Sequence, residues 1–406
     1  MTGASPGPLA AEAAPARRGA SAESMLATVR ELAADVYTGR RVGTPGGQAA
    51  AAWLTDQLRA PGAAVTLDEF QVTGVKELHA TPSLAIGRRA LIHRRDFAEQ
   101  LSSAEVPDRR SGPLTSSEAG SWHGRWVVAP AADQQTLARA HSQDAAGLLV
   151  PRGVDEAGWM PKMIAGPPTG PVAILSVRTD LHAELAHSAG ETVIASVPMR
   201  TITTTGTNVY GTFTAPFPGG LSVLLTAHFD GVGDDPQQRH PAAVDNASGV
   251  AVVLEAARLL SVGLAPGVGL VVAFLDAEEA GARGSAHHAP QLAAGTFVIN
   301  VDGAAHIGEA AAVEAGGPAE QLLAAVDHAG RFTGVPLRAG AMASDNRRYA
   351  AAGLPAIGIG MGMPGYQTPA ETPDRVDVPT LLAAASLVTA TVDHLLNNSA
   401  QLGETL

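Results

Sequence analysis

One apolar segment, residues 221–230 (LSVLLTAHFD), ends in a histidine and an aspartate that are two positions apart. Because residues i and i+2 of an extended chain share a face, the carboxylate of Asp230 can fix the orientation of the His228 imidazole. A carboxylate commonly supports a metal-bound histidine in this way. For this pair considered alone, the alternative is a histidine that hydrogen-bonds to water at the end of a strand.

Carboxylates follow two further apolar segments. Asp276, Glu278 and Glu279 come directly after VVAFL, and Asp302 comes directly after TFVINV. A solvated cluster of charges is the ordinary explanation for such acids, but here they continue apolar, strand-like runs. Two adjacent glutamates also suit two different roles, since one can bind a metal while the other accepts and returns a proton.

Asp245 stands just before a helical stretch, NASGVAVVLEAARLL. Taken by itself, either Asp245 or Asn246 is expected to cap this helix by accepting a backbone N–H. A capping loop can also direct a carboxylate into a cleft, so the two roles are compatible.

These carboxylates would repel one another strongly if they met in one cleft without compensation. A dication is the simplest compensation. The chain contains no cysteine, so a transition-metal site must use histidine and carboxylate ligands. Such a ligand set suits zinc, with manganese or cobalt also possible.

The segments that carry these residues predict an α/β fold. Near-continuous apolar, strand-like runs alternate with helical stretches, which is typical of a mixed, mostly parallel doubly wound sheet with helices on both faces. Ligands of such sheets bind beyond the carboxyl ends of the strands, where the acids and His228 fall. The expected strands are 221–230, 267–277, 296–303 and 354–362, and the expected helices are 246–260, 319–334 and 378–398.

The chain is expected to divide into a discontinuous domain and an insert. Residues 22–76 and 206–400 would form the domain with the parallel sheet, and residues 77–205 would form a β-rich insert of short strands. Residues 1–21 are rich in Ala, Pro and Gly and are expected to be a disordered tail.

Composition excludes some classes of function. The net charge of −12 and the absence of a basic stripe argue against binding to nucleic acid or to an anionic membrane. The N-terminus lacks the pattern of a signal peptide, and no run of about 18 apolar residues is expected to span a membrane. A soluble, cytoplasmic protein is therefore expected, and its oligomeric state is left open.

Taken together, the motifs resemble those of the co-catalytic zinc aminopeptidases of the M28 family. The resemblance covers about residues 30–75 and 207–395. It rests on GRRVGTPGGQAAAAWLTDQLRAPGA in the first range and on TAHFDGVG, AAVDNASGVAVVLEAARLL, FLDAEEAGARGS, VINVDG, SDNRRYAAAGLPA and YQTPAETPDRVD in the second. The middle of the chain, with GRWVVAP, AGLLVP and VAILSV, is similar to the protease-associated (PA) domain that many members carry as an insert.

The resemblance implies a role for each matching residue. His228 and Asp302 would hold one zinc, Asp245 would bridge two zincs and Glu279 would bind the second. Glu278 would be the general base for a metal-activated water, Asp230 would orient His228, and Tyr366 would donate a hydrogen bond to a developing oxyanion.

Three residues depart from the family pattern. Gln367 stands where the family has a histidine ligand of the second zinc, Asn346 stands where a histidine is usual, and Glu371 stands where an aspartate is usual. The residues assigned to the first metal are all present. Because a neutral amide oxygen suits calcium or magnesium better than zinc, we expect one tight zinc site and a weak or empty second position.

Three functions are compatible with this pattern. The first is zinc-dependent hydrolysis of an amide or peptide bond in a small substrate, as in an aminopeptidase. The second is a mono-metal enzyme of small-molecule metabolism that forms, cyclises or hydrolyses an amide. The third is a non-catalytic relative that uses the cleft for binding, which the presence of Glu278 disfavours.

Overall fold

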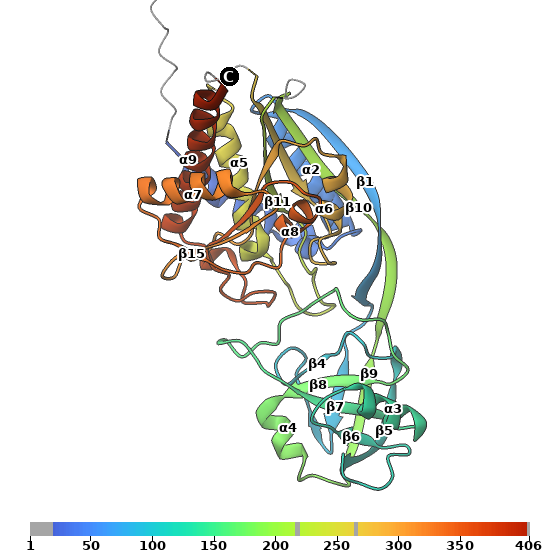
Figure 1. Cartoon of the computed structure of the whole chain (residues 1–406). Helices are drawn as coiled ribbons and strands as arrows, with labels where there is room; N and C mark the ends of the chain where they lie inside the picture. Colours follow the sequence, from blue (N-terminus) through green and yellow to red (C-terminus); the bar gives the residue numbers. More distant parts are fainter. Residues whose placement is uncertain (1–18, 216–219, 264–266, 404–406) are drawn as a thin grey trace, which may run out of the picture.

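The computed structural model describes residues 19–215, 220–263 and 267–403. Residues 1–18 of the predicted tail lie outside these ranges, so only its last three residues are described. The described chain forms a large lobe and a small lobe, joined by two long strands (Figure 1). The small lobe consists of residues 79–198, which lie between those two strands in the sequence.

The large lobe is built on a mixed sheet that holds eight strands within the described residues, in the order β1-β10-β12-β11-β13-β16-β14-β15. Its central neighbours β12, β11, β13 and β16 are parallel, whereas β10 and β14 pair antiparallel to them. The strands are β1 (Ala64–Leu78), β10 (Met199–Thr214), β11 (Ser222–His228), β12 (Gly269–Leu275), β13 (Thr296–Val301), β14 (Ala311–Gly316), β15 (Leu337–Ala339) and β16 (Ala356–Gly360).

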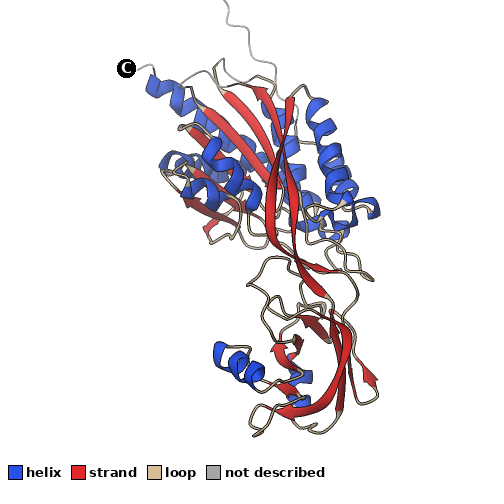
Figure 2. Ribbon diagram, turned by 90° about the vertical axis from the view of Figure 1, so that its right-hand side faces the viewer, coloured by secondary structure: helices blue, strands red, loops and turns tan. Residues whose placement is uncertain are grey.

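Helices cover both faces of this sheet, as the sequence predicts (Figure 2). On one face, the main apolar core packs the sheet against α1 (Ala22–Leu32), α2 (Pro45–Arg59), α5 (Ser248–Leu260), α7 (Glu320–Thr333) and α9 (Val378–Gly403). On the other face lie α6 (Arg283–His288) and α8 (Asn346–Ala351), with a smaller apolar cluster beneath them. The predicted α/β architecture is confirmed.

Burial on both faces explains why the central strands read as unbroken apolar runs. Every residue of β11 is buried. Val223 and Leu225 face the main core, while Leu224 faces the smaller cluster. His228 lies four positions after Leu224, and alternate residues of a strand point to the same face of the sheet. The side chain of His228 therefore lies on the face that carries α6 and α8.

The small lobe carries a second mixed sheet, of order β3-β2-β9-β5-β6-β7-β8-β4 in the described chain. Its core surrounds Trp126, which is fully buried. The elements are β2 (Ser83–Ile86), β3 (Arg89–Ala90), β4 (Phe97–Glu99), β5 (Val106–Ser116), β6 (Trp126–Val128), β7 (Gly147–Arg152), β8 (Ile174–Arg178), β9 (Thr192–Val197), α3 (Gln134–Ser142) and α4 (Thr179–Leu185).

The two lobes share a continuous ribbon rather than flexible linkers. β1 and β10 pair antiparallel from Ala64 opposite Thr212 to Leu78 opposite Met199. A bulge interrupts the pairing at Gly74, where φ is +83°. The predicted domain boundaries, 76/77 and 205/206, therefore fall inside paired strands.

Some elements differ from the sequence-based expectation. β14 and β15 were not predicted, because AAVEAG and LRA lack the β-branched runs that mark the other strands. In the described chain, the stretch Val378–Asn397 of α9 is long and apolar enough to cross a membrane, although no such run was expected. Half of that stretch is buried, and α9 packs against α5 and α7, which explains its apolar character.

Candidate active site

His228 is the last residue of β11 and lies at the carboxyl end of the parallel strands. Its imidazole is buried, and Nε2 lies 3.0 Å from Oδ1 of Asp245 and 3.3 Å from Oδ1 of Asp302. Burial would lower the pKa of His228, but the charge of Asp302 and the carboxylates of Asp230 and Asp245 raise it well above the usual value. The structure thus brings together three residues that are far apart in the sequence.

Asp302 directly follows β13, and a chain of buried polar side chains holds this end of the strand. Thr226 of β11 donates to Oδ1 of Asn300 at 2.7 Å, and Nδ2 of Asn300 donates to Oγ of Ser344 at 3.0 Å. These bonds connect β11, β13 and the loop before α8, so they fix the relative positions of the strand ends that carry His228 and Asp302.

Asp230 links His228 to the glutamate pair. Its carbonyl oxygen lies 3.2 Å from Nδ1 of His228, and its Oδ1 lies 3.4 Å from the same nitrogen. Its carboxylate also accepts the backbone N–H of Glu278 at 3.0 Å and that of Glu279 at 3.2 Å. Asp230 therefore fixes the His228 imidazole relative to the Glu278–Glu279 backbone that follows β12.

Asp245 lies in a wide turn, Ala243–Ala247, just before α5. The capping role that Asp245 or Asn246 could take belongs to Asn246, whose Oδ1 accepts the N–H of Gly249 at 2.9 Å and that of Gly303 at 3.0 Å. Asp245 does not cap the helix, because its side chain points to His228 instead.

His228, Asp245 and Asp302 fit a metal ion. They are the one group of this kind in the described chain, and one ligand atom from each lies within 4.8 Å of the others. Oδ1 of Asp245 is buried, and apart from its close contact with Nε2 of His228 it has no hydrogen-bond donor among the described residues. Burial and the charges of Asp302 and Asp230 raise the pKa of Asp245. A dication would give this oxygen a further partner and reduce the repulsion between the carboxylates, and this donor set suits zinc.

Glu278 and Glu279 follow β12 at the same edge of the sheet. Burial raises the pKa of both carboxyls well above the usual value. The charges of Asp302 and Asp345 act in the same direction on Glu278, and those of Asp245 and Glu278 do so on Glu279. A carboxyl with a raised pKa beside a cleft is suited to accept and release a proton.

Gln367 lies in the loop after β16 and is buried, with φ at +54°. Its Nε2 donates to Oε2 of Glu279, while its Oε1 is buried without a donor. Glu371 accepts the backbone N–H of Gln367 at 2.8 Å through Oε2 and that of Asp245 at 2.5 Å through Oε1. Glu371 therefore ties the Gln367 loop to the loop of Asp245.

A cleft of about 710 Å³ opens beside these residues. Asp245, Glu278 and Asp302 line it, and the partly exposed ring of Tyr366 borders it. The rest of the wall is mostly small or apolar, with one acid and one base: Gly308, Glu309, Ala310, Ala312, Arg338, Ala341, Met342, Ala343, Gly360, Gly362 and Met363.

Two residues of the SDN motif are placed beside the site but are held by other partners. Asp345 accepts the hydroxyl of Ser285 at 2.5 Å, and burial raises its pKa to about 7. Nδ2 of Asn346 donates to Glu314 at 3.2 Å.

Other acids and histidines are placed away from the metal group. His287 contacts Asp68 at 3.1 Å and His288 contacts the Tyr349 hydroxyl at 3.0 Å, so both histidines are held by other partners. Asp276 accepts the N–H of Thr207 at 2.9 Å and braces β10.

Sequence reasoning missed Arg40, which is fully buried beneath the site. Its guanidinium donates to the carbonyls of Leu32 at 2.5 Å, Phe229 at 2.7 Å, Ala242 at 2.7 Å and Pro241 at 3.0 Å. It thereby holds both ends of the segment between His228 and Asp245. Nothing in the sequence around Arg40 distinguishes it from a surface arginine.

The fold and the buried site together indicate the structural class of the protein. A mixed sheet covered by helices, with a buried His–Asp–Asp group at the carboxyl ends of its parallel strands, is a zinc-exopeptidase-like arrangement. Residues 208–392 match the model of Peptidase family M28. This similarity to the M28 peptidases covers the part of the chain that carries His228, Asp245 and Asp302.

Known proteins resemble the chain in sequence and in fold. It is 29% identical over 311 residues to the probable lipoprotein aminopeptidase LpqL of Mycobacterium tuberculosis, and the match covers 70% of this chain and 59% of that protein. The zinc aminopeptidase BSAP of Bacillus subtilis has a TM-score of 0.71 at 19% identity, covering 91% of this chain and 94% of its own. An aminopeptidase from Aneurinibacillus sp. strain AM-1 has a TM-score of 0.67 at 22% identity, covering 92% and 93%.

Proposed function

We propose that this protein hydrolyses an amide or peptide bond next to the free amino group of a small substrate. The main evidence for this proposal is the buried group of His228, Asp245 and Asp302. Glu278 lines the same cleft as Asp245 and Asp302. The likeness to M28 aminopeptidases supports the same reaction class.

In this reaction, each residue of the site would have a separate role. His228, Asp245 and Asp302 would hold a zinc ion, which supplies Lewis-acid polarisation and makes water more acidic. Glu278 would accept the proton of the attacking water and deliver it to the leaving amine. Tyr366 would donate its hydroxyl proton in a hydrogen bond to the oxyanion that develops on the carbonyl.

We further propose that the second metal position is weak or empty. The amide of Gln367 donates to Glu279, so a second cation would have to displace that bond. The unpaired Oε1 of Gln367 offers only a neutral oxygen in place of an imidazole. Loss of a supporting group typically costs ~10–100-fold in metal affinity, and the loss of a direct ligand should cost at least as much.

Two measurements test the proposed function. Metal analysis after dialysis should find one tightly held zinc per chain, and two would contradict the weak second site. A panel of aminoacyl-arylamides, with and without added zinc, should show turnover that requires the metal. A zinc-loaded protein that cleaves no member of the panel would contradict the aminopeptidase reaction.

Two further assignments belong to this proposal. We assign residues 77–205 to a PA-like insert, because a separate sheet with its own core occupies most of that range. We also propose a cytoplasmic location, which cell fractionation with an antibody against the chain would check.

A further inference from the structure

A segment of the small lobe reaches the active site of the large lobe. Residues 153–173 connect β7 to β8, and we call them the β7–β8 segment. The backbone N–H of Lys162 in this segment donates to the carbonyl oxygen of Gln367 at 2.9 Å. The small lobe therefore contacts the very residue that stands beside Glu279.

The side chain of Lys162 contacts a second loop of the site. Its Nζ donates to the carbonyls of Gly233 at 2.8 Å and Asp234 at 3.0 Å, and it lies 3.0 Å from Oδ1 of Asp235. These three residues belong to the stretch 229–244, which runs between His228 and Asp245. One lysine thus holds the stretch that connects His228 to Asp245 and also the loop of Gln367.

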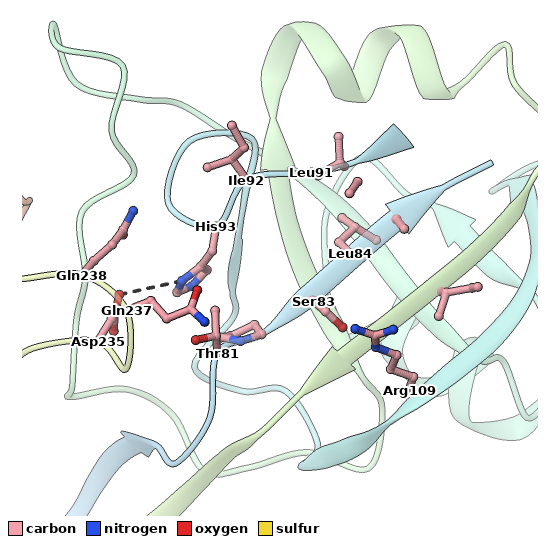
Figure 3. A pocket seen from close by; sticks show the side chains of 14 residues that line it. Thr81, Ser83, Leu84, Leu91, Ile92, His93, Arg109, Asp235, Gln237 and Gln238 are labelled. Carbon is pink, nitrogen blue, oxygen red and sulfur yellow. Dashed lines mark ion pairs between the residues drawn. The ribbon is translucent and has the colours of Figure 1, made fainter. Parts of the chain in front are cut away.

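A buried charge cluster surrounds this contact. Arg94 of the small lobe donates through Nε to Oδ2 of Asp235 at 2.7 Å and through Nη2 to Glu99 at 2.6 Å. His240 of the large lobe lies 3.2 Å from the same Asp235 carboxylate. Figure 3 shows His93 of the small lobe directed at Asp235 across the junction, beside a cavity of about 450 Å³.

Apolar packing seats the same segment against the large lobe. Ile164 is 1% exposed and belongs to a cluster with Val232, Ala277 and Ala280. Val232 lies in the stretch 229–244, and Ala277 directly precedes Glu278. The β7–β8 segment therefore packs against the backbone on both sides of the site.

Buried ion pairs contribute little net stability, because desolvation offsets much of their attraction. Lys162 and Asp235 are both about 95% buried. Such a pair is better explained by the geometry that it imposes than by the stability that it adds. The loops that it fixes are those of Asp245 and Gln367.

We propose that Lys162 is a positioning residue, through which the small lobe sets the geometry of the metal site. It holds the stretch 229–244 through its ammonium and the Gln367 loop through its backbone. The inference rests on the proposed function only in naming the site as a metal centre.

The test compares two buried lysines at the junction in the full-length protein. Lys162→Met removes the ammonium that holds the stretch 229–244. Lys76→Met is the matched control, because Lys76 is 3% exposed and donates only to the hydroxyls of Thr169 and Thr201 among the described side chains. Both proteins are loaded with zinc or cobalt.

Lys162→Met is expected to release zinc to a chelator at least tenfold faster than Lys76→Met. It should also change the visible spectrum of the cobalt-loaded protein and lower kcat more than it raises KM. Amide exchange in residues 363–372 should accelerate in Lys162→Met while global unfolding stays matched to the control. If zinc release, cobalt spectrum and local exchange are the same in the two variants, the proposal is wrong.

A substitute variant and the metal measurements keep the test of Lys162 separate from protein folding and from the proposed reaction. If Lys162→Met does not fold, Asp235→Asn takes its place and is judged by the same measurements. If the wild-type protein binds zinc but cleaves no arylamide, the proposed reaction fails while the metal measurements still decide the role of Lys162.

Discussion

Among the single residues of the site, Gln367 and Glu371 make the contacts that connect its loops. Gln367 gives an amide hydrogen bond to Glu279, and Glu371 gathers the backbone N–H groups of Gln367 and Asp245. The longer side chain of Glu371, compared with an aspartate, thus has a specific use in joining two loops. Gln367 and Glu371 therefore form one connected arrangement, whereas Asn346 is held separately by Glu314.

Glu278→Gln tests the general base. The amide keeps the shape of the side chain but cannot accept the proton of the attacking water. We expect kcat to fall about 10²–10⁴-fold, which is the usual range for a lost general base. Zinc content should be unchanged, because Glu278 is not in the His228–Asp245–Asp302 group. Activity within a few-fold of the wild type would exclude this role.

Gln367→His tests the second metal position. An imidazole would replace the neutral amide beside Glu279 and should raise the number of tightly held zinc ions from one toward two per chain. Metal analysis after dialysis measures this number. Gln135→His, on the exposed start of α3, controls for an added surface histidine. A stoichiometry that stays at one in both variants would contradict the expectation.

Among the elements of the fold, the carboxyl ends of the strands bring the candidate site residues together. The loops that follow these strands need further contacts to fix their positions. Arg40 performs this task for the stretch between His228 and Asp245. Burial lowers the pKa of Arg40 to about 10, while the charges of Glu371, Asp230, Asp245 and Glu279 oppose that shift. The guanidinium therefore remains protonated and balances part of the negative charge of the site.

Arg40→Met should remove four hydrogen bonds and leave their carbonyls buried. Each such carbonyl costs about 1–3 kcal/mol, so we expect the free energy of unfolding to fall by at least about 3 kcal/mol. Urea denaturation measures this change. Arg59→Met, which alters an exposed arginine paired with Asp56, should change it by less than about 1 kcal/mol. Equal losses in the two variants would refute the role of Arg40.

At the scale of the whole molecule, a buried charge cluster joins the lobes and predicts acid sensitivity. Burial would raise the pKa of Glu99, but Arg94 and His93 lower it from 4.5 to about 2. Because the folded-state pKa lies below the unfolded value, this stabilisation is complete above about pH 4.5 and is lost as the pH falls toward 2. The pKa of Asp235 is shifted in the same direction.

Glu99→Gln should make stability less dependent on pH between 4.5 and 2. We expect urea denaturation at pH 6 and pH 3 to show a smaller loss in this variant than in the wild type. The control is Glu105→Gln, which alters an exposed glutamate beside His79. A pH dependence equal to that of the wild type would show that the cluster does not titrate in this range.

The sequence predicts the fold class well, because its central strands are buried on both faces and their apolar runs are unmistakable. It misses β14, β15 and Arg40, because neither short strands of alanine and glycine nor a lone arginine carry a local pattern. The candidate residues could be found because acids that directly continue apolar strands are unusual. The contacts of Lys162 with Gln367 and Asp235 could not be found, since they join residues that are 205 and 73 positions apart.

The amino-acid sequence is enough to identify the chemical groups of the site and to show that several of them follow buried strands of one sheet. Periodicity and residue type are local properties, so they can be read without the fold. The three-dimensional fold is needed to show that Asp245 faces His228 while Asn246 takes the capping role. It is also needed to show that the Gln367 amide binds Glu279 and that Lys162 of the small lobe contacts both loops. Those outcomes depend on distances between remote segments, which the packing of the two lobes sets.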